Sequence, residues 1–550
     1  MTAKKGFLRN TALMFTAMFI SKAFGALLKI PLGNILGGEG MGYFTTAYSI
    51  YMPVLAFATA GIPTILTRTA AECVSLGDYR RLLLYRRSSL LLSILLGLAG
   101  SILIYISSFP FVYLIVDSPE SITGVFLIAP ATVFCSVTAV YRGYYEGLSD
   151  TLPTAASQVI ESVVRAVSGL GLSYYVYANG ERFFGSVSAA MPYSAAAAIL
   201  GVTLSEFSSM IFMFIRSRRK ADRLMFRGCR VTAGELPDIC RKLFMTALPL
   251  SLGAAASNLL SLADMLTISN CIDLSVSIFG DLWKNDTLLS QIRDNTSDIG
   301  NYMYGCYAGI IIPVYLLAAS VSGVVARCSF PRISSAVVNG TGGKMEREVR
   351  LLIKGTAAIT APATVFVAVL AEPIMKIIYP MRTMEAQLGG LPLSVLSISG
   401  IIPALLGAVY MIFDAHGDYG FPIKMILLGG GMRIVFNIMF ITIPLLNITG
   451  AAVSSVLSGA ICLLFSVKKL KSRYNTNVHC VKYSVPAVMS ALIGGTGAYL
   501  FYSGLKELAG ILPSLLISVI SGGIIYSLMM YLTDKDDCNL VLRRIHAGKK

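Results

Sequence analysis

The chain is dominated by apolar segments of about 20 residues, the length that an α-helix needs to cross the hydrocarbon core of a bilayer. About fourteen such segments follow one another along its 550 residues. Only 13% of the residues are charged, whereas soluble domains carry about 25%. We therefore expect an all-α polytopic membrane protein. The expected spans begin near Phe7, Met41, Ser88, Ile122, Thr154, Val187, Phe244, Asn301, Gly355, Leu391, Phe421, Gly450, Tyr483 and Ile511.

Lysine and arginine gather in alternate loops between these segments. If the N-terminus lies inside, most of the 45 Lys and Arg fall on the inner side, as in residues 80–87, 216–230 and 468–473. This is the positive-inside bias, and it predicts a multi-pass protein of the cell membrane with both termini in the cytoplasm. Topology and attraction to anionic lipid head groups then account for the net charge of +16, so we expect no nucleic-acid partner.

The residue types that carry enzyme chemistry form no recognisable motif. The ten cysteines show no paired CxxC spacing and the three histidines lie far apart, so the sequence predicts neither a disulfide framework nor a metal site. There is no glycine-rich phosphate loop and no GxSxG. We expect a transporter and not an enzyme, with no cofactor. A coupling ion, Na⁺ or H⁺, is left open.

Two inner turns and the helices after them resemble each other. The first begins YEGLSDTLP at Tyr145 and the second begins FDAHGDYGFP at Phe413. In each, two acids and an arginine about three helical turns deeper follow at matching spacing, and a proline follows the second acid at positions that differ by one residue. A parallel repeat six spans apart is a known transporter plan. The matching charges are Glu146 with Asp414, Asp150 with Asp418, and Arg165 with Arg433.

The repeat predicts the organisation of the chain. We expect an N-lobe of spans one to six over residues 1–220 and a basic cytoplasmic linker over 221–242. A C-lobe of spans seven to twelve follows over 243–470. Residues 471–550 add spans thirteen and fourteen and a basic cytoplasmic tail.

Several ionisable residues lie at membrane depth, where each costs at least about 2.5–3.5 kcal/mol. Glu161 and Arg165 share one helix face with the acid first, which is the favourable order. They either neutralise each other so that this face can pack inward, or line a polar cavity. Arg433 has no acid in its own helix and needs a partner elsewhere or an anionic ligand. Asp264 is a lone acid in span seven, and Glu206 is similar but nearer the end of span six.

Span one carries two cations and no acid to pair with them. Lys22 and Lys29 lie two turns apart on one face, with Gly25 between them. Such a face can receive an anionic group close to the backbone, although Lys29 can instead extend to the outer surface. Pro31 and Gly33 weaken the helix, and we expect a bend there.

Three segments resemble a known family. These are KIPLGNILGGEGMGYF from Lys29, YRGYYEGLSDTLPTAASQVIESVVRAV from Tyr141, and MYGCYAGIIIPVYLLAASVSGVVARCSFPRIS from Met303. They are similar to the polysaccharide-biosynthesis and stage V sporulation protein B group of the multidrug/oligosaccharidyl-lipid/polysaccharide exporter superfamily. The Arg142-Gly143-Tyr144 pattern is fairly specific for that group.

The resemblance implies two six-helix lobes around a V-shaped cavity that opens alternately to either side. It implies a flippase for an undecaprenyl-pyrophosphate-linked saccharide, with lipid II foremost, and membrane lipids as the other partner. Ser21, Lys22 and Gly25 match the flippases' Ser-Arg-x-x-Gly pattern, with lysine in place of arginine. We expect a monomer. The expected cavity residues are Ser21, Lys22, Gly25, Lys29, Arg142, Glu161, Arg165, Asp264 and Arg433.

Three alternatives stay open from the sequence. One keeps the fold and carries another lipid-linked oligosaccharide. A second is a cation-coupled multidrug exporter of the same fold, which the excess of deep cations over deep acids disfavours. A third is a non-transporting scaffold of a cell-wall synthesis complex, which would tolerate loss of the cavity charges.

Overall fold

The computed structural model describes most of the chain as helices joined by short turns. No side chain is described for residues 2–20, 22, 23, 26, 233, 285, 295 and 342–344. The described residues are 2–218, 233–285, 287–296, 298–319, 329, 333–337, 342–418, 420–474, 478–533 and 535.

The helices form two compact units. The first comprises Met1–Asn270 and Thr296–Gly309, and the second comprises Cys271–Asn295 and Ile310–Lys550. These units do not test the lobe boundaries expected from the repeat, which stay a prediction. The all-helical fold class expected from the sequence is confirmed by the helices of the described residues.

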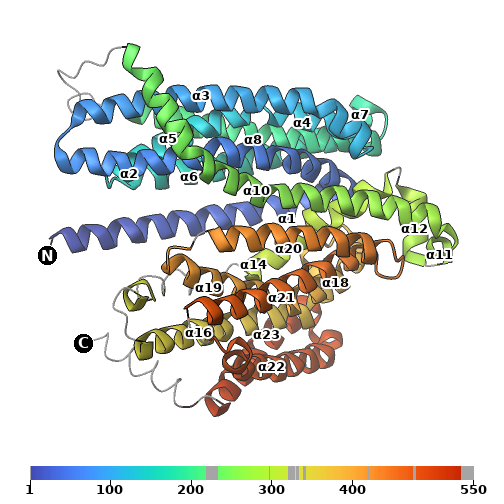
Figure 1. Ribbon diagram of the computed structural model, residues 1–550. Helices are drawn as coiled ribbons and strands as arrows, with labels where there is room; N and C mark the ends of the chain where they lie inside the picture. The colour runs from blue at the N-terminus through green and yellow to red at the C-terminus, as the bar shows by residue number, and fades with distance from the viewer. Residues whose placement is uncertain are drawn as a thin grey trace. The chain divides into compact units, whose positions relative to one another are not determined.

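The first unit contains the helices coloured blue to green in Figure 1 and, farther along the chain, one short helix, α13. One of its cores joins α2, α3, α5 and the start of α10 through Leu66, Tyr85, Tyr144 and Leu243. The helices are α1 (Thr2–Thr59), α2 (Gly61–Leu76), α3 (Tyr79–Pro110), α4 (Ile122–Ile128), α5 (Ala131–Gly147), α6 (Leu152–Ala178), α7 (Gly180–Phe184), α8 (Val187–Ser217), most of α10 (Leu236–Ile278), and α13 (Ile299–Tyr304).

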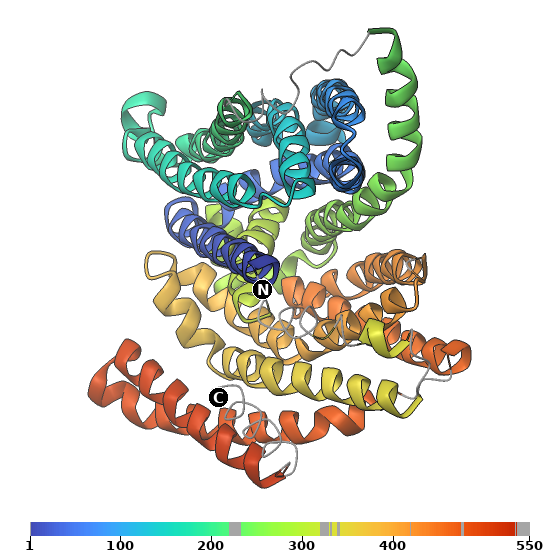
Figure 2. The ribbon, with the colours of Figure 1, turned by 90° about the vertical axis from the view of Figure 1, so that its left-hand side faces the viewer.

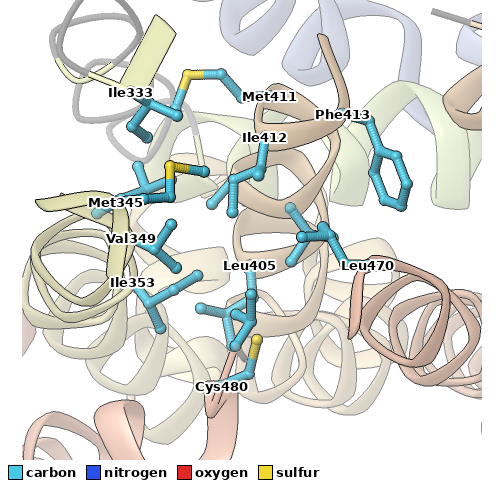
Figure 3. Close-up of a cluster of buried hydrophobic side chains, with 14 of the residues drawn as sticks. Ile333, Met345, Val349, Ile353, Leu405, Met411, Ile412, Phe413, Leu470 and Cys480 are labelled. Carbon is cyan, nitrogen blue, oxygen red and sulfur yellow. The ribbon is translucent and has the colours of Figure 1, made fainter. Parts of the chain in front are cut away.

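The second unit has a core of its own. Side chains from α16, α19 and the start of α22 meet there, among them Val349, Ile412 and Cys480 (Figure 3). The helices of this unit are α11 (Gly280–Asn285), α12 (Thr287–Asn295), α14 (Ile312–Ala319), α16 (Gly342–Val369), α17 (Ala371–Ile378), α18 (Thr383–Ile398), α19 (Ile401–Ala415), α20 (Gly420–Ile441), α21 (Asn447–Tyr474), α22 (Cys480–Ala509) and α23 (Ile511–Thr533).

The exposed surfaces of the helices suit a bilayer. In α23 the small residues Ser514, Ser518 and Gly522 are buried, whereas large apolar side chains such as Ile520 and Leu528 are exposed. The small residues face α22, which lies beside α23 (Figures 1 and 2). Close helix contacts through small residues, with large apolar groups outside, are typical of membrane helices.

Twelve candidate membrane spans are found among the described residues. Neither the part of α1 before Leu27 nor α6 is one of them, and α6 carries the charged pair Glu161 and Arg165. Both segments were expected as spans from the sequence. The twelve are thus compatible with the expected number, which stays a prediction.

The first span bends, but later than expected. Helix α1 keeps helical backbone angles at Pro31 and Gly33, and its one non-helical residue is Gly37, with φ 63° and ψ −165°. The prediction of a bend at Pro31 and Gly33 was therefore wrong in its position. Glycine reaches positive φ at little cost, so the chain bends where glycine permits it. Pro31 removes one helical hydrogen bond, but the backbone angles around it stay helical.

The repeated turns have the same backbone hydrogen bonds in both units. The amide of Asp150 donates to the Tyr145 carbonyl and that of Asp418 to the Phe413 carbonyl, each at 3.0 Å. One residue earlier, Ser149 and Gly417 both have positive φ. This is the Schellman helix end.

An ion pair then fixes each turn to the end of a later helix of its own unit. Asp150 pairs with Arg216 of α8 at 3.1 Å, and Asp418 pairs with Arg473 of α21 at 2.6 Å. The predicted repeat is confirmed at the level of these turns.

Candidate functional site

Arg142 is the first member of a charge cluster inside the first unit. It projects from α5 towards α6 and α8, where its Nε donates to Ser157 Oγ at 2.9 Å. Its Nη2 donates to Ser209 Oγ at 3.1 Å and to Glu161 Oε2 at 2.8 Å. The guanidinium therefore ties three helices together through two hydroxyls and one carboxylate. The sequence had named Arg142 only through the family pattern.

Arg165 is the second guanidinium of the cluster. Its Nη2 donates to Glu161 Oε1 within α6 and to Glu206 Oε1 of α8, the latter at 2.7 Å. Its Nε donates to Ser205 Oγ at 3.3 Å. The predicted pairing of Glu161 with Arg165 on one helix face is confirmed.

The cluster is a network and not a single pair. Glu161 uses one carboxylate oxygen for each arginine, so both of its oxygens accept a charged donor. The side-chain exposures are 14% for Glu161, 28% for Arg165 and 5% for Glu206. With all four side chains ionised, the two arginines and two glutamates sum to zero. Such neutrality and hydrogen bonding are what a buried charge group requires.

Small residues let α6 and α8 approach closely enough to form the cluster. Ser173 and Ser194 exchange hydrogen bonds across the seam, and Ser168 donates to the Gly201 carbonyl. A methyl group added at Gly201 would overlap the backbone of Gly169. The short distance between the helix axes brings the carboxylate of Glu206 to Arg165.

The described residues of span one lie near this cluster. Ser21 Oγ donates to the Gln158 carbonyl of α6 at 3.3 Å. Gly25 is exposed, and a methyl group added there would meet no atom within 4 Å. Lys29 is half-buried, makes no ion pair among the described residues, and lies within electrostatic range of Arg165.

The remaining predicted cavity residues belong to other helices than those of the cluster. Lys22 belongs to α1, but its side chain lies outside the described residues. Asp264 is half-buried in α10 of the first unit. Arg433 belongs to α20 of the second unit.

Sequence reasoning missed the full role of Glu206 and the serines around it. The sequence predicts a deep acid at Glu206 but assigns it no partner. A signal was present in the spacing of small residues along α8, which places Ser194, Gly201, Ser205 and Ser209 along its α6-facing side. That spacing predicts a close helix contact, and a single acid beside such a contact needs a partner on the facing helix.

The second unit has the same turn but does not have the acids of the cluster at the corresponding positions. At the repeat's spacing, Arg142 corresponds to Tyr410 and Glu161 to Gly429. The position ten residues before Arg216 is Glu206, and the position ten before Arg473 is Leu463. Only Arg165 has a charged counterpart, Arg433, so the full cluster is a feature of the first unit.

Comparisons with known proteins give consistent similarities. A family model described as "Polysaccharide biosynthesis protein" matches residues 7–337, and one described as "Lipid II flippase MurJ" matches residues 287–520. The chain is 20% identical to the lipid II flippase MurJ of Bacillus subtilis (strain 168) over 498 residues, which are 88% of this chain and 87% of that protein.

Solved structures share the fold. A structure titled "Lipid II flippase MurJ, inward closed conformation" superposes with a TM-score of 0.65 at 16% identity, covering 96% of this chain and 99% of that one. An inward-facing multidrug resistance MATE family transporter of the MOP superfamily gives a TM-score of 0.60 at 14% identity, covering 83% and 96%. These likenesses concern the fold.

Proposed function

The chain belongs to the polysaccharide biosynthesis protein family, in the MurJ-like group of the multidrug/oligosaccharidyl-lipid/polysaccharide exporter superfamily, and we propose that it is a lipid flippase. The substrate proposed is an undecaprenyl-pyrophosphate-linked cell-wall precursor, lipid II in the first place. It moves from the inner to the outer leaflet by alternating access. The similarity to a lipid II flippase over most of both chains supports this reading.

One observation favours an anionic lipid head group. The first unit holds two guanidinium groups and the Lys29 ammonium at membrane depth, and the guanidiniums are positioned by serines and carboxylates. Guanidinium groups bind phosphate oxygens in a bidentate manner, and lysine binds them as a point charge. Lys29 makes no ion pair among the described residues, whereas the carboxylates of Glu161 and Glu206 are paired, and this favours an anion over an organic cation.

We assign the attraction of the pyrophosphate to Lys22, Lys29, Arg165 and Arg433. Lys29 makes no ion pair among the described residues, so an anion would not have to displace a carboxylate from it. Arg165 is already bound to two carboxylates, so the pyrophosphate would have to compete with them. Glu161, and Asp264 in the same role, would neutralise the cations when no substrate is bound.

The proposed setting is the cell membrane, with both termini in the cytoplasm. Twelve apolar helices among the described residues support a multi-pass membrane protein. The orientation follows from the basic inner loops.

Complementation tests the function in cells. A bacterial host is depleted of its own lipid II flippase, this protein is expressed, and lipid II exposed on the outer leaflet is labelled. We expect restored exposure, lost in Lys22→Ala and Lys29→Ala and retained in Lys376→Ala. Lys376 is the control because its ion pair with Glu372 is exposed.

Two outcomes would point elsewhere. No restoration, with the protein shown to be in the membrane, would favour another lipid-linked saccharide or the multidrug exporter whose fold the chain shares. If lipid II exposure is still restored after the cations are neutralised, the assignment of the anion site is contradicted but the flippase function is not.

A further inference from the structure

Glu206 carries an unsatisfied polar atom in the middle of the cluster. Its side chain is 5% exposed, its Oε1 accepts from Arg165, and its Oε2 is buried with no hydrogen-bond partner. A buried carboxylate oxygen without a donor is costly. Either a donor arrives at Oε2, or Oε2 itself becomes a donor.

The group beside it is a second carboxylate. Glu161 Oε1 and Glu206 Oε1 both accept from Nη2 of Arg165, so the two carboxylates lie side by side. Both oxygens of Glu161 already accept from arginines, but an oxygen has two lone pairs and can accept once more. Two carboxylates can share a hydrogen bond only when a proton lies between them. A shared proton also removes their mutual repulsion.

We propose that Glu206 and Glu161 form a proton-binding site, in which Oε2 of Glu206 takes up a single proton from water and donates it to Glu161. On release, the O–H bond breaks and the proton returns to the aqueous phase. Glu161 is the more exposed of the two acids and provides the route to Glu206. Proton binding at this site does not require lipid II to be the substrate, although the site shares Glu161 with the residues assigned to transport above.

The surroundings favour a proton over a metal cation. The ionisable groups within electrostatic range of the two acids are Arg142 and Cys135 of α5, Arg165 of α6, and Tyr48 and Tyr51 of α1. Lys29 is in range of Arg165, and α4, which also packs on α8, carries no ionisable residue. A metal cation needs several free oxygen ligands, whereas only one carboxylate oxygen of this cluster lacks a partner.

Protonation changes the charge of the cluster. With both carboxylates ionised, the two arginines are balanced. With a shared proton the cluster carries one net positive charge. On the proposed function, the protonated state would attract the pyrophosphate and the deprotonated state would release it, so the proton would couple to the movement of the lipid.

Infrared spectroscopy of the purified full-length protein tests the site without any substrate. Protonated carboxyl groups give a C=O band separate from that of carboxylates. We expect a titrating band in the wild-type protein that is lost in Glu206→Gln and shifted in Glu161→Gln. The same band should persist in Glu372→Gln, which changes an exposed acid of a helical ion pair. Thermal unfolding of each variant shows whether it is folded. If Glu206→Gln does not fold, the shift of the band in Glu161→Gln tests the site.

A wild-type protein with no such band, or a band that persists unchanged in both cluster variants, would overturn the proton site. A second arm adds lipid II in weak buffer with a pH-sensitive dye. Proton uptake that depends on Glu206 is the result expected. If the band is present but no uptake follows lipid II, the site stands and the proposed coupling to that substrate falls.

Discussion

At the scale of single residues, the buried charges of the cluster are stabilised by partners on other helices and not only by a partner close in sequence. Glu161 and Arg165 satisfy the spacing rule for a pair along one helix. Their burial is tolerated because Arg142 and Glu206 complete the network from two other helices. Removing one member therefore leaves other buried charges without a counter-charge.

Arg165→Met tests this dependence. Loss of the guanidinium leaves Glu206 Oε1 without its donor, and removing one partner of a buried ion pair costs about 3–5 kcal/mol. The matched control is Lys376→Met, which breaks another pair four residues apart whose side chains are exposed. An exposed pair contributes about 0–1 kcal/mol. Unfolding by heat or denaturant in detergent micelles measures both.

The double variant Arg165→Met/Glu206→Gln separates a lost counter-charge from a lost contact. Arg165→Met leaves the Glu206 carboxylate without a donor. The second change replaces that carboxylate with a neutral amide, so the double variant should recover part of the lost stability. Equal destabilisation by Arg165→Met and Lys376→Met would contradict the network.

At the scale of helices, the cluster depends on how closely α6 and α8 approach. Serines and glycines occupy the seam, and hydrogen bonds from Ser168 and Ser194 cross it. In a bilayer, helices gain little from apolar contact with each other because lipid is equally apolar. Close backbone approach therefore determines both the stability of this pair and the geometry of the ion network.

Gly201→Ala tests the seam. The added methyl group would overlap the backbone of Gly169, which cannot move aside as a side chain can. Overpacking of this kind costs about 1–3 kcal/mol, and activity should fall with stability. The control is Gly171→Ala in α6, where the added methyl group meets no atom within 4 Å. There, higher helix propensity should give a gain of up to about 1 kcal/mol. If the two variants behaved alike in thermal unfolding, the seam would not be the determinant.

Features that depend on residues close together in the sequence could be predicted, whereas contacts between distant helices could not. The helical fold depends on apolar segment length, and the Glu161–Arg165 pair and the repeated turns depend on local spacing, so all of these were predictable. The link from Arg165 to Glu206 joins residues on different helices, and no local period encodes which face of α6 meets α8. The bend of α1 was expected at Pro31 and Gly33, but its position depends on which glycine takes positive φ, here Gly37.

At the scale of the whole molecule, one scaffold serves two units with different chemistry. Both units keep the same turn and the same ion pair at its end, through Asp150 with Arg216 and Asp418 with Arg473. The first unit adds a buried network of two arginines and two glutamates, and the corresponding positions of the second unit carry Tyr410, Gly429 and Leu463. Arg433 keeps the position of Arg165 in the second unit, so one of the four charges of the network is common to both units.

The most direct test of the proposed function is transport by the purified protein. Fluorescent lipid II is placed in liposomes with and without the protein, and a membrane-impermeant quencher reports how fast the inner-leaflet pool reaches the outer leaflet. We predict rapid exchange of lipid II with the wild-type protein, strongly slowed in Lys29→Ala and unchanged in Lys376→Ala. Exchange no faster than in protein-free liposomes, with the protein shown to be folded and inserted, would contradict a lipid II flippase.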